Sequence, residues 1–302
     1  MIKIENLTKC FDGRTILDGL NLNVRKGSVY GLVGVNGSGK TTAIKHITGI
    51  LRQDAGSVTI DGTPVYDNVA IKSMLGYIPD DLYFLPQYNM AMLRGFYRSI
   101  YPNWDDTRYN QLLSDFNLDP KCKLSRFSKG MQKQAAIVLV MSAMPEVLIL
   151  DEPLDGLDPL MRMQVFHTIR EDVAQRGLTV LVSSHNLKEM EGFCDCIGIL
   201  KGGKMTIQRD LKDLQGSVHK LQLAFPQGTN SPDKYQGLDI LHHETRGSVE
   251  LLVVRGDAAA INSRIQALNP LICDNLPLSL EEVFIYENIQ PAYATAEGGT
   301  AS

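Results

Sequence analysis

The sequence predicts an α/β fold whose parallel sheet carries a phosphate-binding loop. A strand at residues 28–32 runs into a glycine-rich loop, and a helix opens directly after it at Thr41. Two further short runs, Val147–Leu150 and residues 179–182, consist of apolar and β-branched side chains. Such runs are typical of strands buried on both faces of a parallel sheet. From a first strand at residues 3–7 to about residue 205, strands alternate with helices, which is the pattern of an α/β core.

The glycine-rich loop has the spacing GxxxxGK[ST] between a strand and a helix, which is the context that this pattern requires. In such a loop the backbone N–H groups turn inward around phosphates, and the helix N-terminus adds positive potential. Lys40 would neutralise the β and γ oxygens, and the Thr41 hydroxyl would hold magnesium. The alternative is a glycine-rich turn in an unrelated enzyme. The predicted ligands are therefore ATP and Mg²⁺, bound by Gly34, Asn36, Gly37, Ser38, Gly39, Lys40, Thr41 and Thr42.

A helical subdomain is predicted at about residues 80–145, where the sequence becomes aromatic and polar. Pro102 and Pro120 interrupt this stretch. A long helix is expected to open within Phe-Ser-Lys-Gly-Met-Gln, with Ser128 as its N-cap, and to run through Met144. Taken alone, this segment reads as a capped helix with no further role.

Two carboxylates follow the run Val147–Leu150. Asp151 and Glu152 would lie at the carboxyl end of a buried strand, where open α/β sheets bind their ligands. Asp151 is predicted to hold magnesium through water, and Glu152 to act as general base on the attacking water. The alternative is an ordinary acidic turn, which the neighbouring phosphate loop disfavours.

A small second α/β domain is predicted after the ATPase domain. Apolar residues alternate with polar ones at positions 221–225 and 249–253, and an alanine-rich helix is expected at residues 257–268. Ser279 and Glu282 form a capping box for a last helix that runs to about residue 287. The predicted domains are therefore residues 1–205, residues 206–290, and a disordered tail at residues 291–302.

The composition restricts the partners of this chain. The net charge is −4, which gives no electrostatic basis for wrapping nucleic acid. The five cysteines are an odd number without CxxC spacing, which indicates reduced thiols in a cytosolic protein. The longest apolar stretch is far shorter than the ~18 residues of a membrane span, and no signal peptide is evident. The expected location is therefore cytoplasmic, and any role at a membrane requires a partner.

The order of the motifs resembles that of the nucleotide-binding subunits of ATP-binding cassette transporters. The phosphate loop, Phe-Ser-Lys-Gly-Met-Gln, Ile-Leu-Asp-Glu-Pro, Gly-Leu-Asp ending at Asp158, and Ser-His ending at His185 follow in that family's order. The resemblance covers residues 2 to about 205 and implies a phosphate-loop ATPase core with an N-terminal antiparallel β part. The end of the chain, residues 278–284, resembles the extension on cassette subunits of exporters of drugs, antibiotic peptides and lipids.

The resemblance also implies a mechanism. Two such subunits would face head to tail, so that Ser128 and Gly130 of one touch the γ-phosphate held by the other, while Asp158 lies in the loop that crosses the interface. His185 matches the histidine that contacts the γ-phosphate and orders the attacking water. Phe11 matches the aromatic residue that stacks on adenine. A membrane-spanning permease and a second cassette subunit, identical or related, are the implied partners, at the inner face of the cell membrane.

The sequence departs from the family pattern in two places. Lys129 and Met131 stand where the commonest pattern of the signature segment has glycines, which leaves Ser128 and Gly130 in place, and Asp80 stands where the family carries a glutamine that contacts magnesium. Asp80 is predicted to hold the metal in its place, and the alternative is a solvated turn residue. A soluble cassette ATPase that acts on ribosomes or DNA is the competing function, but such proteins generally carry two cassettes or a long coiled-coil insertion, and neither is present.

Overall fold

The computed structural model describes residues 1–211, 213, 216, 218–226 and 234–288. Its contacts divide the chain into two compact units, Met1–Gln208 and Arg209–Ser302. Each unit is α/β, as the sequence predicts, and the predicted tail lies outside the described residues. No helix among the described residues has the length and apolar character of a membrane span.

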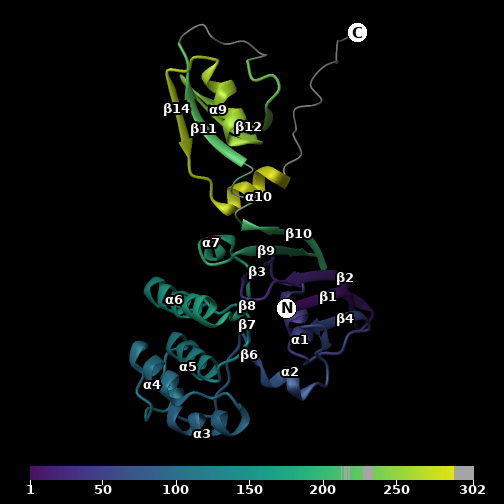
Figure 1. Cartoon of the computed structure of the whole chain (residues 1–302), viewed down its shortest axis with the longest axis vertical. Helices are drawn as coiled ribbons and strands as arrows, with labels where there is room; N and C mark the ends of the chain where they lie inside the picture. The colour runs from purple at the N-terminus through teal and green to yellow at the C-terminus, as the bar shows by residue number, and fades with distance from the viewer. Residues whose placement is uncertain (212, 214–215, 217, 227–233, 289–302) are drawn as a thin grey trace. The chain divides into compact units, whose positions relative to one another are not determined.

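A parallel sheet forms the centre of the first unit, with strand order β10-β9-β3-β8-β7-β6 (Figure 1). Strands β6, β7, β8, β3 and β9 pair in parallel, so that the ends of β3, β7 and β8 lie at the same edge. The side chains of β3, β7 and β8 are buried along their whole length, as expected for strands covered on both faces. The strands are β3 (Val29–Val33), β6 (Leu75–Ile78), β7 (Val147–Leu150), β8 (Thr179–Ser184), β9 (Cys196–Lys201) and β10 (Lys204–Asp210).

An antiparallel sheet with order β2-β1-β4-β5 flanks this centre. Its strands are β1 (Ile2–Phe11), β2 (Arg14–Val24), β4 (Ala55–Ile60) and β5 (Thr63–Pro64). Apolar side chains such as Ile4 and Leu22 pack into one core with Ile44 of the first helix and Leu181 of the parallel sheet. This shared core fixes the phosphate loop between the two sheets.

The first unit has one helix directly after the phosphate loop, a group of three helices, and several further helices. Helix α1 (Lys40–Ile47) follows the phosphate loop, and Figure 1 shows α3, α4 and α5 gathered into one helical group. The N-cap prediction for Ser128 is confirmed, because its Oγ accepts a hydrogen bond from Met131 N at 3.2 Å. The remaining elements are α2 (Val69–Ser73), α3 (Met90–Ile100), α4 (Asp106–Asp115), the 3₁₀ turn η1 (Leu124–Arg126), α5 (Lys129–Ser142), α6 (Pro159–Arg176) and α7 (Leu187–Met190).

The second unit holds an antiparallel sheet with order β12-β13-β11-β14. The predicted capping box is present: Ser279 N donates to Glu282 Oε2 at 3.0 Å, and Glu282 N donates to Ser279 Oγ at 3.2 Å. The elements of this unit are β11 (Val218–Ala224), β12 (Asp239–Arg246), β13 (Val249–Arg255), α9 (Ala258–Gln266), β14 (Ile272–Leu276) and α10 (Leu280–Asn288).

Candidate functional site

The phosphate loop connects β3 to α1, and its backbone leaves room only for glycine at Gly34. A Cβ atom there would lie 2.5 Å from the Leu200 carbonyl oxygen and 2.6 Å from Ser38 Oγ. Within the described residues, the buried Oγ of Ser38 has no hydrogen-bond partner. A buried hydroxyl without a partner is costly, and a phosphate oxygen would satisfy it. The loop therefore fits a nucleotide polyphosphate.

The other predicted loop residues differ in exposure. Asn36, Gly37 and Thr41 are exposed, Gly39 is buried, and Thr42 is half-buried. Gly39 has a φ of 107°, a backbone conformation that side chains with a Cβ rarely adopt. The exposed hydroxyl of Thr41 and the carboxylate of Asp151 are hard oxygen donors of the kind that Mg²⁺ prefers.

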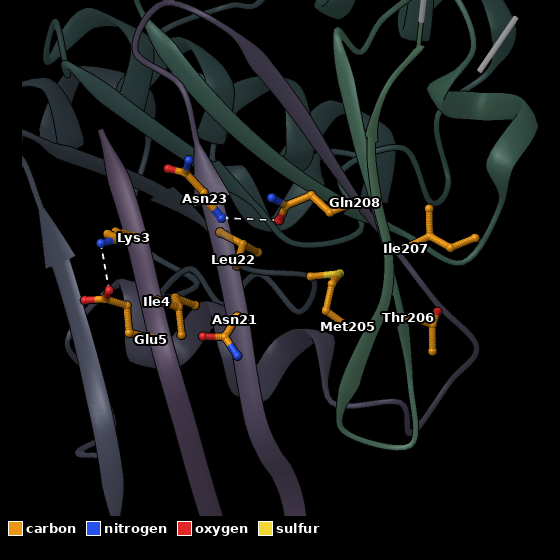
Figure 2. Close-up of a pocket in the computed structure, with 10 residues that line it drawn as sticks. All are labelled: Lys3, Ile4, Glu5, Asn21, Leu22, Asn23, Met205, Thr206, Ile207 and Gln208. Carbon is orange, nitrogen blue, oxygen red and sulfur yellow. Dashed lines mark hydrogen bonds and ion pairs between the residues drawn. The ribbon is translucent and has the colours of Figure 1, made fainter. Parts of the chain in front are cut away.

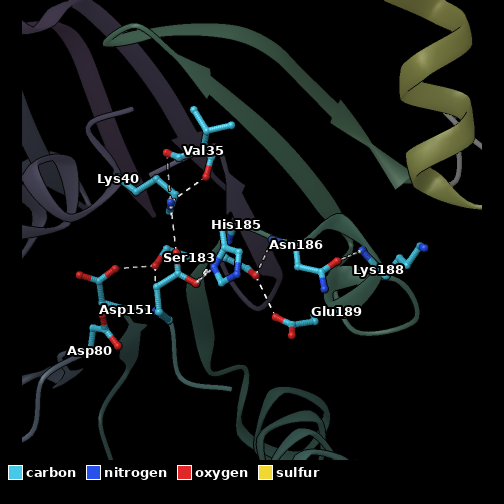
Figure 3. A network of polar contacts seen from close by, with 12 residues as sticks. Val35, Lys40, Asp80, Asp151, Ser183, His185, Asn186, Lys188 and Glu189 are labelled. Carbon is cyan, nitrogen blue, oxygen red and sulfur yellow. Dashed lines mark hydrogen bonds and ion pairs between the residues drawn. The ribbon is translucent and has the colours of Figure 1, made fainter. Parts of the chain in front are cut away.

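The carboxylate of Glu152 contacts both of the other predicted catalytic groups, Lys40 and His185, which Figure 3 labels. Its Oε1 is 3.1 Å from Lys40 Nζ, and its Oε2 is 3.0 Å from His185 Nδ1. Lys40 also donates to the Gly34 carbonyl at 2.7 Å. Lys40 and Glu152 are both buried, while the His185 side chain is 45% exposed. The structure thus brings together the base, the cation and the histidine that the sequence predicts.

Asp151 is held by a serine that sequence reasoning missed. Ser183 Oγ donates to Asp151 Oδ1 at 2.5 Å and accepts a hydrogen bond from Glu152 N at 3.0 Å. All three residues are buried. Because β8 lies between β3 and β7, its last residues face both the loop and the carboxylates. The sequence signal for this serine is Ser-Ser-His at residues 183–185, in which the family resemblance concerns only the second serine and the histidine.

Asp80, the predicted metal ligand, follows β6 and pairs with a lysine. Its Oδ1 lies 3.6 Å from Lys133 Nζ, and its side chain is half exposed. Burial raises the pKa of the Asp80 carboxyl above its usual value, and the ammonium group of Lys133 only partly offsets this rise. Lys133 was not singled out in the sequence, because a lysine within a helix carries no signal of its own.

The residues predicted to act across a dimer lie at helix N-termini. Ser128 caps α5, and Asp158 caps α6 by accepting a hydrogen bond from Met161 N at 2.9 Å. A Cβ atom on Gly130 would lie 3.1 Å from the Gly156 carbonyl oxygen, so the two segments pack closely. Within the described residues, Ser128 and Asp158 make no hydrogen bond or ion pair with Lys40, Glu152 or His185.

Phe11, the predicted adenine-stacking residue, ends β1 with 41% of its surface exposed. The Lys9 ammonium lies 5.2 Å from the centre of its ring. An exposed aromatic face is what base stacking requires, but no described contact joins Phe11 to Lys40 or Glu152. Its role stays a prediction.

A second set of contacts supports His185. Ser184 Oγ donates to Glu189 Oε2 at 2.9 Å, and Arg162 donates to Glu189 Oε1 at 2.8 Å. Arg162 also donates to the Leu157 carbonyl at 3.0 Å. These bonds connect the segment before Asp158 to the segment that carries His185. In addition, Asp155 offers an oxygen within 4.8 Å of ligand atoms of Glu152 and His185.

A separate hollow of about 400 Å³ lies between β1, β2 and β10 (Figure 2). Gln208 Oε1 crosses it to accept hydrogen bonds from Asn23 N at 3.2 Å and from the Tyr30 hydroxyl at 2.9 Å. It shares no residue with the phosphate-loop site. Its lining residues are Lys3, Ile4, Glu5, Asn21, Leu22, Asn23, Met205, Thr206, Ile207 and Gln208.

Several known proteins resemble this chain in sequence and fold. The family model described as "ABC transporter" matches residues 17–155. ABC transporter ATP-binding protein YtrB of Bacillus subtilis is 33% identical over 285 residues, which cover 94% of this chain and 97% of YtrB. Lantibiotic transport ATP-binding protein SrtF of Streptococcus pyogenes is 32% identical over 234 residues, covering 70% of this chain and 91% of SrtF. A solved ATP-binding subunit of an ABC transporter superposes with a TM-score of 0.66 at 27% identity, covering 71% and 92% of the two chains.

Proposed function

This chain belongs to the ATP-binding proteins of ABC transporters, and from that premise we propose that two cassette subunits close around two ATP molecules and power export through a separate membrane-spanning subunit. As a member of this family, the chain is an ATPase. The observation that carries our assignment of the site is the Glu152 carboxylate, which lies within 3.1 Å of both Lys40 and His185.

Each residue of the proposed site has its own task in ATP hydrolysis. Bound Mg·ATP supplies the γ-phosphoryl group and its leaving group. Lys40 and the loop N–H groups hold the phosphates, while Thr41 and Asp151 hold the metal. Glu152 accepts the proton of the attacking water. Because Nδ1 of His185 meets Glu152, its Nε2 is the ring atom that can contact the nucleotide.

The N-terminus of α5 supports the proposed dimer. The N-terminus of α5, with Ser128 and Gly130, offers N–H groups to a phosphate, and a second copy can deliver them. Asp158 lies at the start of α6, beside the Gly156 segment that packs on Gly130. Closure would then depend on ATP, and loss of phosphate would reopen the interface.

The helical group offers a surface for the permease. Met92, Phe96 and Ile100 are four residues apart and lie on one face of α3, with 51%, 59% and 52% of their surfaces exposed. Tyr83, in the segment between Asp80 and α3, is 82% exposed. Exposed apolar side chains grouped in this way are typical of a protein interface. We assign this face to the membrane-spanning subunit at the inner face of the membrane.

The relatives favour a class of cargo. SrtF is a lantibiotic transport protein by name, and residues 278–284 of this chain resemble the extension on cassette subunits of exporters. We therefore assign drugs, antibiotic peptides or lipid-like molecules as cargo. The ATPase domain would extend to about residue 205, and residues 206–290 would form a separate domain.

Purification of the tagged chain from a detergent-solubilised membrane tests this function. Its co-expressed membrane-spanning partner should be retained, and ATP with magnesium should shift the cassette from monomer to dimer in analytical ultracentrifugation. Retention of ribosomal proteins in place of a membrane protein would favour the non-transport ATPase. A cassette that stays monomeric with ATP in the Glu152→Gln variant would contradict the dimer.

A further inference from the structure

Lys133 is a buried lysine of α5, and its ammonium group faces the backbone carbonyl of Glu152, the proposed general base. Only 7% of the residue is exposed. Its Nζ donates to the Glu152 carbonyl oxygen at 2.7 Å and lies 3.6 Å from Asp80 Oδ1. A buried ammonium group is stable only when hydrogen bonds or an opposite charge compensate it. Asp80 and the Glu152 carbonyl together supply both.

The contact matters because the backbone of Glu152 is unusual. Its φ is 45°, in the left-handed region that residues with a Cβ adopt at an energetic cost. The conformation persists because bonds hold the peptide on both sides. Glu152 N donates to Ser183 Oγ at 3.0 Å, and the Glu152 carbonyl accepts from Lys133. This turn is what directs the carboxylate to Lys40 and His185.

We propose that Lys133 is a positioning residue for Glu152 and that Asp80 controls it through their ion pair. This inference rests on the proposed role of Glu152 as general base. Asp80, which the sequence predicts as a metal ligand, would then act on Glu152 through Lys133. A carboxylate at position 80 is then explained by the lysine that it faces.

The ion pair between Asp80 and Lys133 also connects the segment next to the exposed apolar face of α3 with the backbone of Glu152. Asp80 belongs to the segment between β6 and α3, and α3 carries the exposed apolar face described above. Asp80 and Lys133 line one cleft of about 350 Å³, together with Asp81, Leu82, Lys129, Gln132, Asp155 and Gly156. A shift of this segment changes the distance from Asp80 to Lys133. A movement of the helical group would therefore change how firmly Lys133 holds the backbone of Glu152.

A double-mutant cycle on the full-length chain tests the proposal. Lys133→Met should lower kcat about 30-fold while the Kd for ATP changes less than about 2-fold, because only the placement of the base is lost. Lys133→Arg, which keeps the charge and a donor, should restore most of kcat. Asp80→Asn should lower kcat about 5-fold in the wild type and have no effect in the Lys133→Met background. Asp81→Asn, a neighbouring carboxylate on the same cleft, should leave kcat unchanged.

Several outcomes would overturn the proposal. Wild-type kcat in Lys133→Met would show that Lys133 does not position Glu152. Additive effects of the two substitutions would show that Asp80 does not act through Lys133. A raised magnesium requirement in Asp80→Asn, with additive kcat effects, would assign Asp80 to the metal.

A second variant covers the case in which Lys133→Met does not fold. Lys133→Gln keeps a hydrogen-bond donor but loses the charge, so Asp80→Asn must have no effect on kcat in its background. Glu152→Gln serves as the separate test of the base: full turnover in that variant contradicts the proposed function itself.

Discussion

The ammonium group of Lys40 lies 3.1 Å from the carboxylate of Glu152, although the strands that precede them in the chain, β3 and β7, are not neighbours in the sheet. Strand β8 lies between them and contributes Ser183 and His185 to the same place. The Glu152 carboxylate is thus held near the ends of three strands, and the predictions below separate their contributions.

Glu152→Gln should abolish turnover while leaving ATP binding intact. The amide keeps the size of the side chain but cannot accept the proton of the attacking water, so we expect kcat to fall by about 100-fold or more. Steady-state phosphate release measures kcat, and equilibrium binding of a fluorescent ATP analogue measures affinity. Glu146→Gln changes an exposed carboxylate just before the same strand and should behave as wild type.

Lys40→Ala should lose binding as well as hydrolysis. The cation stabilises phosphate charge in the ground state and in the transition state, so we expect the Kd for ATP to rise by about 10- to 100-fold. Isothermal titration calorimetry gives the affinity. Lys45→Ala, in the same helix, is the matched control, and equal affinities for both variants would contradict the role of Lys40.

Ser183→Ala should weaken both folding and catalysis. The substitution leaves the Glu152 N–H and the Asp151 carboxylate without their shared buried partner, which costs about 1–3 kcal/mol in the free energy of unfolding. Urea denaturation measures this loss. Ser142→Ala removes another buried hydroxyl, one that bonds within α5 to the Val138 carbonyl, and it should leave kcat unchanged.

Phe96→Ser should impair assembly with the membrane-spanning subunit. Because Phe96 is 59% exposed and lies on the apolar face of α3, its loss should not affect the fold of the isolated chain. Co-purification with the partner should decrease severalfold, while the ATPase activity of the isolated chain stays at its wild-type level. Tyr66→Ser, another exposed aromatic residue outside the helical group, should assemble normally.

The stability of the second unit should depend on the ionisation of Glu250. Burial raises the pKa of this carboxyl, but hydrogen bonds from Lys234, Tyr235 and His243 outweigh burial and hold it below the usual value of 4.5. The contribution of Glu250 is therefore fully present above pH 4.5 and is lost as the pH falls through its lower folded value. Hydrogen exchange of β13 between pH 3 and 6 should show this loss, and Glu250→Gln should reduce the pH dependence. Glu244→Gln, at an exposed pair with Arg246, should reduce it less.

The sequence predicted the local parts of the site better than their mutual contacts. The phosphate loop, the Ser128 cap and the strand ending at Leu150 are read from adjacent residues, and each is where its pattern predicts. The left-handed turn at Glu152 had no signal, because it depends on bonds from Ser183 and Lys133. Those contacts arise from strand order and helix packing, which single-sequence patterns do not contain. The domain limits and the assigned roles of the site residues stay predictions.

The strand order also has a consequence for how the chain acquires its structure during synthesis. Strand β3, which carries the phosphate loop, pairs with β8 and β9, so its sheet partners are made only after the whole helical group has been translated. Contacts between such distant parts of the chain are slow to form. Until β8 leaves the ribosome, the apolar residues of β3 lack their final neighbours and are prone to aggregate. Strand β3 therefore gains its final sheet neighbours only late, once residues 179–184 have been made.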